Sequence, residues 1–419
     1  MRRQETKLKI RPVAMLSPLC LCLFAGSARA DLEPFTLGAS ESLEHQSNVF
    51  HDDTVRTADW LSITELNAGL SQPLGRDKLV ASAAIDYNRY KRSRDLDATG
   101  YRAAGQFDWS TIGDLSGSLG ADSSRRQYVY GETAEVLPGT TPVIINGRNL
   151  QTDNHAFARL QLGGVSRWTI NGGADVSERN YSNPAFAASE ERQWAGNLGT
   201  SYATSPDLSF GVVGYYTNGR YPHGSLEGTS SNFTTKTFSL TSKWQASGNS
   251  SLNSSLGYTI ENNEILGGSR NFVSGSLGWN WTPPSHFGVS LSLKRSSDAD
   301  STGGANTAIL NANQLTGIAI NNEAYLDVTY ALTAKVSLDA NADYSLRKYA
   351  DIREATPPDL SGSTRTARFY LTAHYQPTRT TDLSCGGGRE IRKIDATLVG
   401  ITPAYTDTYV QCVASIHFD

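Results

Sequence analysis

The most telling absence in this chain is that of a long apolar run. Outside the first 30 residues no stretch of 18 or more apolar residues occurs, which excludes a membrane-spanning helix. Only 38% of the residues are hydrophobic, and the mean hydropathy is −0.38. A secreted soluble β protein fits this composition. A transmembrane β-barrel also fits, because its strands alternate apolar with polar residues and keep the average hydropathy low.

The sequence motifs of common enzymes are absent as well. The chain has no G-x-x-x-x-G-K-[ST], no H-E-x-x-H, no C-x-x-C and no G-x-S-x-G. Its seven histidines lack metal-ligand spacing, and His155 and His374 are more simply interpreted as polar lining than as catalytic residues. The run Gly386–Gly388 relieves crowding or lets a strand bend, rather than cradling phosphate. We therefore expect no enzyme activity, no cofactor and no metal.

The N-terminus has the three parts of a cleavable signal peptide. A basic segment that ends at Arg11 precedes the apolar stretch Val13–Gly26, and Ala28-Arg29-Ala30 is a small-residue cleavage site. Cleavage of residues 1–30 removes six basic residues and Glu5, leaving 31 Lys and Arg against 40 Asp and Glu. This mildly acidic balance argues against nucleic acid as a partner.

Period-two alternation runs through the rest of the chain. In Leu79–Tyr87, Thr99–Trp109 and Val336–Leu346, apolar residues occupy one parity and polar residues the other. The pattern predicts strands with one apolar and one polar face, each long enough to cross a bilayer when tilted. Since no linker or composition shift divides residues 31–419, one closed sheet explains this segment better than several globular domains.

The connections between these segments alternate between short and long, which is typical of periplasmic turns and extracellular loops. The longest predicted loops are Gly131–Gly147 and Ser297–Ile318. The fold class predicted for residues 31–419 is all-β, a transmembrane antiparallel up-and-down β-barrel of about 18 strands in the bacterial outer membrane. The predicted short turns are Pro73–Asp77, Ile112–Asp114, Gly163–Val165, Ser205–Asp207, Ser247–Ser250, Pro283–His286, Thr333–Lys335 and Pro377–Thr381.

Tryptophans mark one predicted membrane boundary. Trp109, Trp168, Trp244 and Trp281 each lie beside a predicted short turn, on the apolar parity. Because aromatic rings favour the membrane interface, we interpret these four as an aromatic girdle. The last predicted strand carries Phe418 at the penultimate position, one residue short of the terminal aromatic common in such barrels.

Two cysteines, Cys385 and Cys412, remain after Cys20 and Cys22 leave with the signal peptide. Both lie on the apolar parity, and they are equidistant from the middle of the predicted Lys393–Tyr405 loop, so a simple hairpin places them opposite each other. Opposed residues come close enough for a disulfide, and the periplasm is oxidising. A disulfide and a pair of buried thiols both remain open, and either role is structural.

The polar parity predicts which side chains line the interior, and charges of both signs fall on it. Such residues pair across strands and stiffen the wall, or in a pore they set a transverse field that acts on solutes. No ring of one sign is present, so the sequence predicts no ion selectivity. The candidate lumen residues are Arg102, Asp108, Asp122, Arg126, Asp153, Arg159, Arg167, Asp175, Arg179, Lys243, Lys294, Asp327, Asp339, Asp343, Arg347 and Arg368.

Several short segments carry a family resemblance. They are Asp86–Tyr90, Leu96–Tyr101, Leu115–Gly120 and Gly219–Pro222, together with Trp109. Through them the chain resembles the EpsL-type outer-membrane proteins of bacterial exopolysaccharide loci of the exosortase-associated type. The order and spacing of segments resemble the family along most of residues 31–419, whereas the residue identities resemble it only in these short segments. It implies a barrel that helps polysaccharide cross, or assemble at, the outer membrane, and it brings no catalytic or ligand motif.

The leading expectation is therefore a wide barrel in exopolysaccharide secretion, with outer-membrane lipid, polysaccharide and other export proteins as partners. The residues themselves support a polar lumen, and only the resemblance supports the polysaccharide. Tyr90, Tyr325 and Tyr370 are candidates for stacking on sugars. The alternatives are a general diffusion porin for small solutes and a non-conducting structural or adhesive barrel. The sequence leaves the oligomeric state open.

Overall fold

The computed structural model describes residues 34–52, 54–128, 147–164, 166–223, 231–263, 268–297, 319–349, 362–398 and 403–418. The predicted signal peptide and most of the two longest predicted loops lie outside these residues. The strands are β1 (Phe35–Gln46), β2 (Asp59–Leu74), β3 (Asp77–Tyr90), β4 (Ala98–Ser110), β5 (Leu115–Gln127), β6 (Leu150–Leu162), β7 (Trp168–Tyr181), β8 (Glu191–Ser205), β9 (Leu208–Tyr221), β10 (Ser231–Ser247), β11 (Ser250–Asn263), β12 (Gly268–Trp281), β13 (Phe287–Ser297), β14 (Ala319–Ala331), β15 (Val336–Tyr349), β16 (Gly362–Tyr375), β17 (Thr381–Ile394) and β18 (Tyr405–Phe418).

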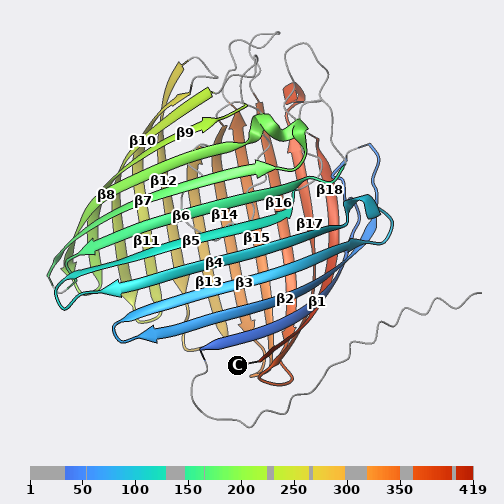
Figure 1. Ribbon diagram of the computed structural model, residues 1–419, viewed down its shortest axis with the longest axis horizontal. Helices are drawn as coiled ribbons and strands as arrows, with labels where there is room; N and C mark the ends of the chain where they lie inside the picture. The colour runs from blue at the N-terminus through green and yellow to red at the C-terminus, as the bar shows by residue number, and fades with distance from the viewer. Residues whose placement is uncertain are drawn as a thin grey trace, which may run out of the picture. The chain divides into compact units, whose positions relative to one another are not determined.

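These strands form one closed antiparallel barrel. Each strand pairs with the next along the chain, and β18 pairs with β1. The 18-stranded sheet confirms the predicted fold class. Figure 1 shows β1–β9 running obliquely across the wall nearest the viewer, with β10–β18 behind them. None of the helices among the described residues has the length and hydrophobicity to span a membrane.

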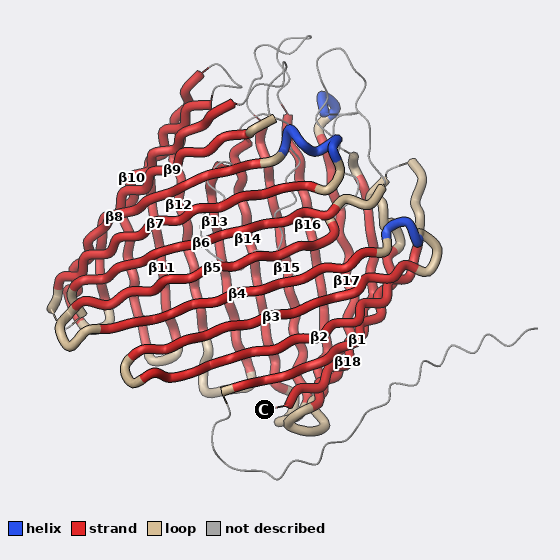
Figure 2. Tube along the Cα trace, viewed as in Figure 1, coloured by secondary structure: helices blue, strands red, loops and turns tan. Residues whose placement is uncertain are grey.

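Short and long connections lie at opposite ends of the barrel. We call the end with the short turns the turn end, and the other the loop end. Gly75 and Gly163 have φ of +70° and +90° in connections at the turn end, a conformation that glycine adopts without a steric cost. The short helical segments η1 (Arg94–Leu96), η2 (Pro184–Ser189) and η4 (Ala396–Leu398) belong to long connections (Figure 2).

The pairing register keeps the apolar parity of all strands on one face. Leu66 of β2 opposes Ile85 of β3, which opposes Tyr101 of β4. Large apolar side chains on this face are exposed, such as Leu198 at 67% and Leu256 at 62%. An exposed apolar surface around a closed barrel is the lipid-facing surface, so the opposite parity faces the lumen.

Two rows of tryptophan lie on the outer face. Trp109, Trp168, Trp244 and Trp281 lie at the turn end of their strands, where the sequence places a girdle. A second row at the loop end contains Trp60 and Trp194, the latter packed against Tyr216 with ring centroids 5.2 Å apart. The second row was not predicted from the sequence, because its tryptophans follow long loops.

Buried hydrophobic clusters gather at the loop end. One contains Val49, Leu61, Tyr90 and Leu96, a second Tyr128, Tyr181 and Phe186, and a third Ala319, Tyr349 and Leu398. All are drawn from strand ends and the long connections beside them. The barrel therefore has its packed core where the connections cover the strand ends.

Carboxylates fix the backbone of these connections. The Asp59 carboxylate accepts hydrogen bonds from the amides of Arg92 and Ser93, at 3.1 and 2.8 Å. Asp395, beyond the end of β17, accepts from both the amide and the hydroxyl of Ser363 at 2.8 Å. The Ser363 hydroxyl and amide hold the pKa of the Asp395 carboxyl below its ordinary value.

Cys385 and Cys412 are directly opposed in the β17–β18 register, with Cα atoms 4.1 Å apart, and their sulfur atoms form a disulfide. The bond lies on the outer face, beside the strand pair β18–β1 that closes the barrel. It links two strands that already exchange backbone hydrogen bonds, so its role is structural. A mass measured without reductant gives 2 Da less than the reduced chain if the bond forms, about two hydrogen masses.

Candidate functional site

The inward face carries the charged residues that the sequence selects as lumen candidates. Fifteen of the sixteen candidate lumen residues lie within strands, on the parity opposite to the exposed apolar face, and thirteen of these fifteen are arginines or aspartates. These thirteen are Arg102, Asp108, Asp122, Arg126, Asp153, Arg159, Asp175, Arg179, Asp327, Asp339, Asp343, Arg347 and Arg368. Lys243 of β10 and Lys294 of β13 share this face.

Arg167 is a correction to that prediction. It lies in the connection before β7, which begins at Trp168, rather than in the barrel wall. Its Nη1 atom lies 3.5 Å from the hydroxyl of Tyr202, which opposes Trp168 on the outer face. The alternating pattern extends one residue before the start of β7, so parity alone assigned Arg167 to the lumen.

A histidine on β6 joins three strands on the inner face. His155 Nδ1 lies 2.9 Å from an Asp122 oxygen on β5, and Nε2 lies 3.2 Å from an Asp175 oxygen on β7. The guanidinium carbon of Arg159 lies 4.5 Å above the ring of Phe157, which stacks on His155. The imidazole therefore links two carboxylates from the strands on either side of β6.

The neighbouring carboxylate Asp153 is shared by two arginines. Arg179 Nε lies 2.9 Å from it and Arg126 Nη2 lies 3.8 Å from it, while Arg179 Nη1 is 3.8 Å from Glu191. On β4, Arg102 pairs with Glu65 of β2 at 2.7 Å. These contacts agree with the structural interpretation of the mixed charges, in which they pair across strands.

The inner face of β14–β18, which we call the charged wall, contains a second set of ion pairs. Arg368 pairs with Glu390 at 2.7 Å, and the Tyr405 hydroxyl donates to the same carboxylate. His374 Nε2 lies 3.0 Å from Asp339, and its Nδ1 lies 3.9 Å from Asp382. Arg368 and Glu390 are mostly buried, so each holds the charge of the other in place of water.

Two carboxylates of the charged wall have no cationic partner in contact. Within the described part of the chain, Asp327 and Asp343 form no salt bridge, although Asp343 directly opposes Arg368 in the register. Arg368 turns to Glu390 instead. These two aspartates leave negative charge available to a solute in the lumen.

A different surface lines β9–β12. Its inward residues include a cluster of serines and threonines on neighbouring strands, which we call the hydroxyl wall. The hydroxyl of Thr259 lies 2.9 Å from both Thr237 and Ser274, and Ser255 lies 2.8 Å from Ser276. The hydroxyl wall consists of Thr217, Thr235, Thr237, Ser239, Ser255, Thr259, Ser274 and Ser276.

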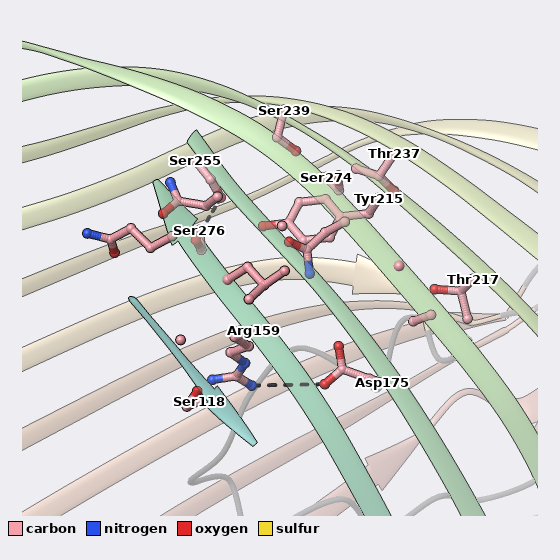
Figure 3. Close-up of a pocket in the computed structure, with 18 of the residues that line it drawn as sticks. Ser118, Arg159, Asp175, Tyr215, Thr217, Thr237, Ser239, Ser255, Ser274 and Ser276 are labelled. Carbon is pink, nitrogen blue, oxygen red and sulfur yellow. Dashed lines mark hydrogen bonds and ion pairs between the residues drawn. The ribbon is translucent and has the colours of Figure 1, made fainter. Parts of the chain in front are cut away.

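A recess of about 710 Å³ lies on the inner face, lined by residues of β4–β13 that include part of the hydroxyl wall. Figure 3 shows Arg159, Asp175 and Tyr215 facing the same space as Ser255 and Ser276. Asp108 and Lys294 also line it. Its lining combines many hydroxyls with three cations and two carboxylates, which suits a polar, hydroxylated solute. No group of three His, Cys, Asp or Glu suited to a metal occurs in the described ranges.

The hydroxyl wall is the part of the site that sequence reasoning missed. The prediction selected only charged residues on the polar parity. Ser and Thr were passed over because they are common in the strands and turns of this chain. The signal was present in Thr235-Lys236-Thr237-Phe238-Ser239, where hydroxyls occupy every position of the inward parity.

Solved structures show which fold this is. No protein-family model matches the chain, and no curated protein matches it. OpdK of Pseudomonas aeruginosa, solved with vanillate, matches with a TM-score of 0.50 and 10% identity over 92% of this chain and 99% of OpdK. OccK2 (OpdF) of the same organism has a TM-score of 0.47 and 11% identity, covering 92% and 97%.

A BenF-like porin from Pseudomonas fluorescens Pf-5 has a TM-score of 0.46 and 10% identity, covering 92% of this chain and 100% of the porin. At such identities the likeness shows the fold and no shared ligand. The girdles, the lipid-facing surface and the fold shared with OpdK together place the chain in the outer membrane of Gram-negative bacteria, as a closed 18-stranded barrel of porin architecture.

Proposed function

We propose that this barrel is a passive diffusion channel for small, hydroxylated, polar solutes. The observation that carries the proposal is the inner face itself, with its hydroxyl wall and a recess of about 710 Å³. Barrels of 16–18 strands are wide enough to enclose an aqueous channel. The fold shared with OpdK favours a general porin, the alternative to the exopolysaccharide expectation.

The paired charges support a channel that favours neutral solutes. His155 and Arg179 each join carboxylates on neighbouring strands, and the guanidinium of Arg179 offsets part of the negative charge on β6–β8. Thr237, Ser255 and Ser276 of the hydroxyl wall are at least partly exposed and line the recess, where their hydroxyls present donors and acceptors without net charge. A solute with many hydroxyls exchanges water for these groups at little cost, since each hydrogen bond to water is replaced by one to the wall.

The test is conductance of the purified, refolded chain in a planar bilayer, together with swelling of proteoliposomes in neutral sugars of increasing size. A diffusion channel gives steady ohmic conductance and swelling rates that fall as the sugar becomes larger. Empty liposomes and heat-denatured protein are the controls. Absence of both conductance and swelling would overturn the proposal and favour a structural or adhesive barrel.

Exopolysaccharide export is a second candidate, favoured by the segments that carry the EpsL-type resemblance. Several of their residues have structural roles at the loop end. Tyr90 and Leu96 are buried together, and the Asp97 carboxylate accepts the Tyr90 amide at 2.7 Å. Gly219 leaves the space that the ring of Phe233 fills. The resemblance therefore concerns how the barrel is built more than what it binds.

Polymer partitioning in a deletion strain tests this second candidate. Polymer trapped in the periplasm, and released when the gene is restored, would support export. Unchanged extracellular polymer would remove the resemblance-based function and leave the diffusion channel. A double Asp327→Ala, Asp343→Ala variant tells whether the free carboxylates of the charged wall contribute to export.

A further inference from the structure

Two tyrosine rings meet on the inner face of the charged wall. Tyr370 of β16 and Tyr409 of β18 have ring centroids 5.3 Å apart and planes inclined by 20°. They lie on either side of Gly388 of β17, which directly opposes both in the register. Figure 1 shows these three strands side by side. Both rings are only partly buried, so part of their surface faces the lumen.

Glycine is what allows the rings to meet. A Cβ atom at Gly388 would meet the Phe369 carbonyl oxygen, and it would also lie 2.7 Å from Tyr370 Cδ2 and 2.9 Å from Tyr409 Cζ, closer than real contacts allow. A Cβ at Gly386 would lie 2.9 Å from the Tyr370 hydroxyl. The glycine run in this strand therefore forms a floor that seats two aromatic side chains. This gives the run a more specific role than the bending or relief of crowding expected from the sequence.

Hydrogen-bonding groups extend this row on both sides. In the register, Asp327 of β14 opposes Asn341 of β15, and Asn341 opposes Tyr370. On the other side Tyr409 opposes Gln46 of β1, whose amide donates to Glu44 at 2.7 Å. The two rings thus lie at the centre of one continuous row, with amides and carboxylates beyond each ring.

This arrangement matches the chemistry of a sugar ring. One face of a pyranose presents C–H groups that pack on the electron-rich face of an aromatic ring. Its equatorial hydroxyls point outward in the plane, toward amide and carboxylate groups at the edge. An acyclic polyol has the same hydroxyls but no flat face to stack. The uncompensated Asp327 disfavours sugars that carry a carboxylate.

We propose that Tyr370 and Tyr409, seated on Gly386 and Gly388, form a stacking subsite for a neutral pyranose ring. The inference rests on the proposed channel function and names the class of solute that the channel retains in passing. The control residue is Tyr344 of β15, which lies on the outer face of the barrel, 45% exposed, and so faces away from the subsite.

Current block by maltotriose in a planar bilayer tests the subsite, with sorbitol as the acyclic control. The unmodified chain shows block by maltotriose at lower concentration than by sorbitol. Tyr370→Ala raises the half-blocking concentration of maltotriose by about five- to tenfold, the effect of one lost aromatic contact. Tyr370→Phe keeps the block, and the control Tyr344→Ala leaves it unchanged.

A second variant keeps both rings and removes their seat. Gly388→Ala forces the rings apart and weakens the block in the same direction as Tyr370→Ala. Heat-modifiable migration on gels shows whether each variant is folded. If Tyr370→Ala and Gly388→Ala are folded and conduct normally but are blocked by maltotriose like the unmodified chain, the subsite is overturned and the channel stands.

If the unmodified chain does not conduct, the proposed function fails by itself. Equilibrium dialysis of maltotriose with the detergent-solubilised barrel then decides the subsite. Binding that disappears in Tyr370→Ala and persists in Tyr344→Ala supports it. Equal binding by all three proteins, or none by the unmodified chain, contradicts it.

Discussion

The hydroxyl wall of β9–β12 and the charged wall of β14–β18 line the same lumen by different means. The hydroxyl wall satisfies its polar groups with one another, as Thr259 does with Thr237 and Ser274. The charged wall satisfies them with ion pairs such as Arg368–Glu390. Hydroxyls are neutral and small, so each can be lost cheaply, whereas each member of a buried ion pair depends on its partner. The two surfaces should therefore differ in mutational tolerance and in their effect on ions.

The largest effect is expected at Arg368. Replacing it by Met leaves the buried Glu390 carboxylate without its cation, which costs about 3–5 kcal/mol of unfolding free energy. Urea unfolding of the refolded barrel in lipid vesicles, followed by tryptophan fluorescence, measures it. The double variant Arg368→Met, Glu390→Met should recover most of the loss. A single variant as stable as the unmodified chain would contradict the importance of the pair.

A matched change on the hydroxyl wall should cost much less. Thr259→Val removes a fully buried hydroxyl that contacts the hydroxyls of Thr237 and Ser274. These two hydroxyls are uncharged and can rotate to bond each other or water. We expect a loss of about 1 kcal/mol by the same urea measurement. A loss equal to that of Arg368→Met would remove the contrast between the walls.

The two walls should also differ in how strongly substitutions in them change ion selectivity. Asp327→Asn with Asp343→Asn removes two carboxylates that form no salt bridge within the described ranges, so the ratio of cation to anion permeability should fall by roughly twofold. The reversal potential in a KCl gradient measures this ratio. Thr237→Val on the hydroxyl wall is the control and should leave it unchanged. A larger shift from Thr237→Val than from the aspartates would reverse the assignment.

The smallest effect is expected outside the bilayer, where the charged wall meets its loop end. The pKa of Asp395 is lowered by hydrogen bonds from Ser363, so its contribution to stability is present above the unfolded-state pKa. That contribution is lost as the pH falls through the lower, folded-state pKa. Ser363→Ala should therefore slightly flatten the acid side of the stability profile. The measurement is the urea midpoint between pH 6 and pH 3, and an unchanged profile would argue against the hydrogen bonds.

Much of the fold could be predicted from the sequence, because lipid and water impose opposite demands on alternate residues. The parity of Val336–Leu346, the short turn at Gly75 and the girdle position of Trp168 all follow from local pattern. Trp60 and Trp194 were missed because a row beside long loops has no short-turn signal. Arg167 was misplaced because parity does not state where a strand begins.

The candidate site was predictable only in its composition. Arg159, Asp175 and Asp122 were selected as lumenal, but their arrangement around His155 depends on the registers of β5–β6 and β6–β7. The free carboxylate of Asp343 depends on Arg368 turning to Glu390, which no local pattern encodes. The hydroxyl wall was overlooked because serine and threonine are neutral and common, so they become informative only when several strands bring them together.

The sequence by itself determined the face to which each side chain points. Side chains alternate between the two faces of a strand, and the lipid-facing side favours apolar side chains. Only the tertiary structure decided which side chains meet. Tyr370 and Tyr409 are separated by a strand, a loop and 39 positions, yet the registers of β16, β17 and β18 bring their rings together over Gly388. Register is set by hydrogen bonds along whole strands and by closure of the barrel, and these are properties of the complete sheet.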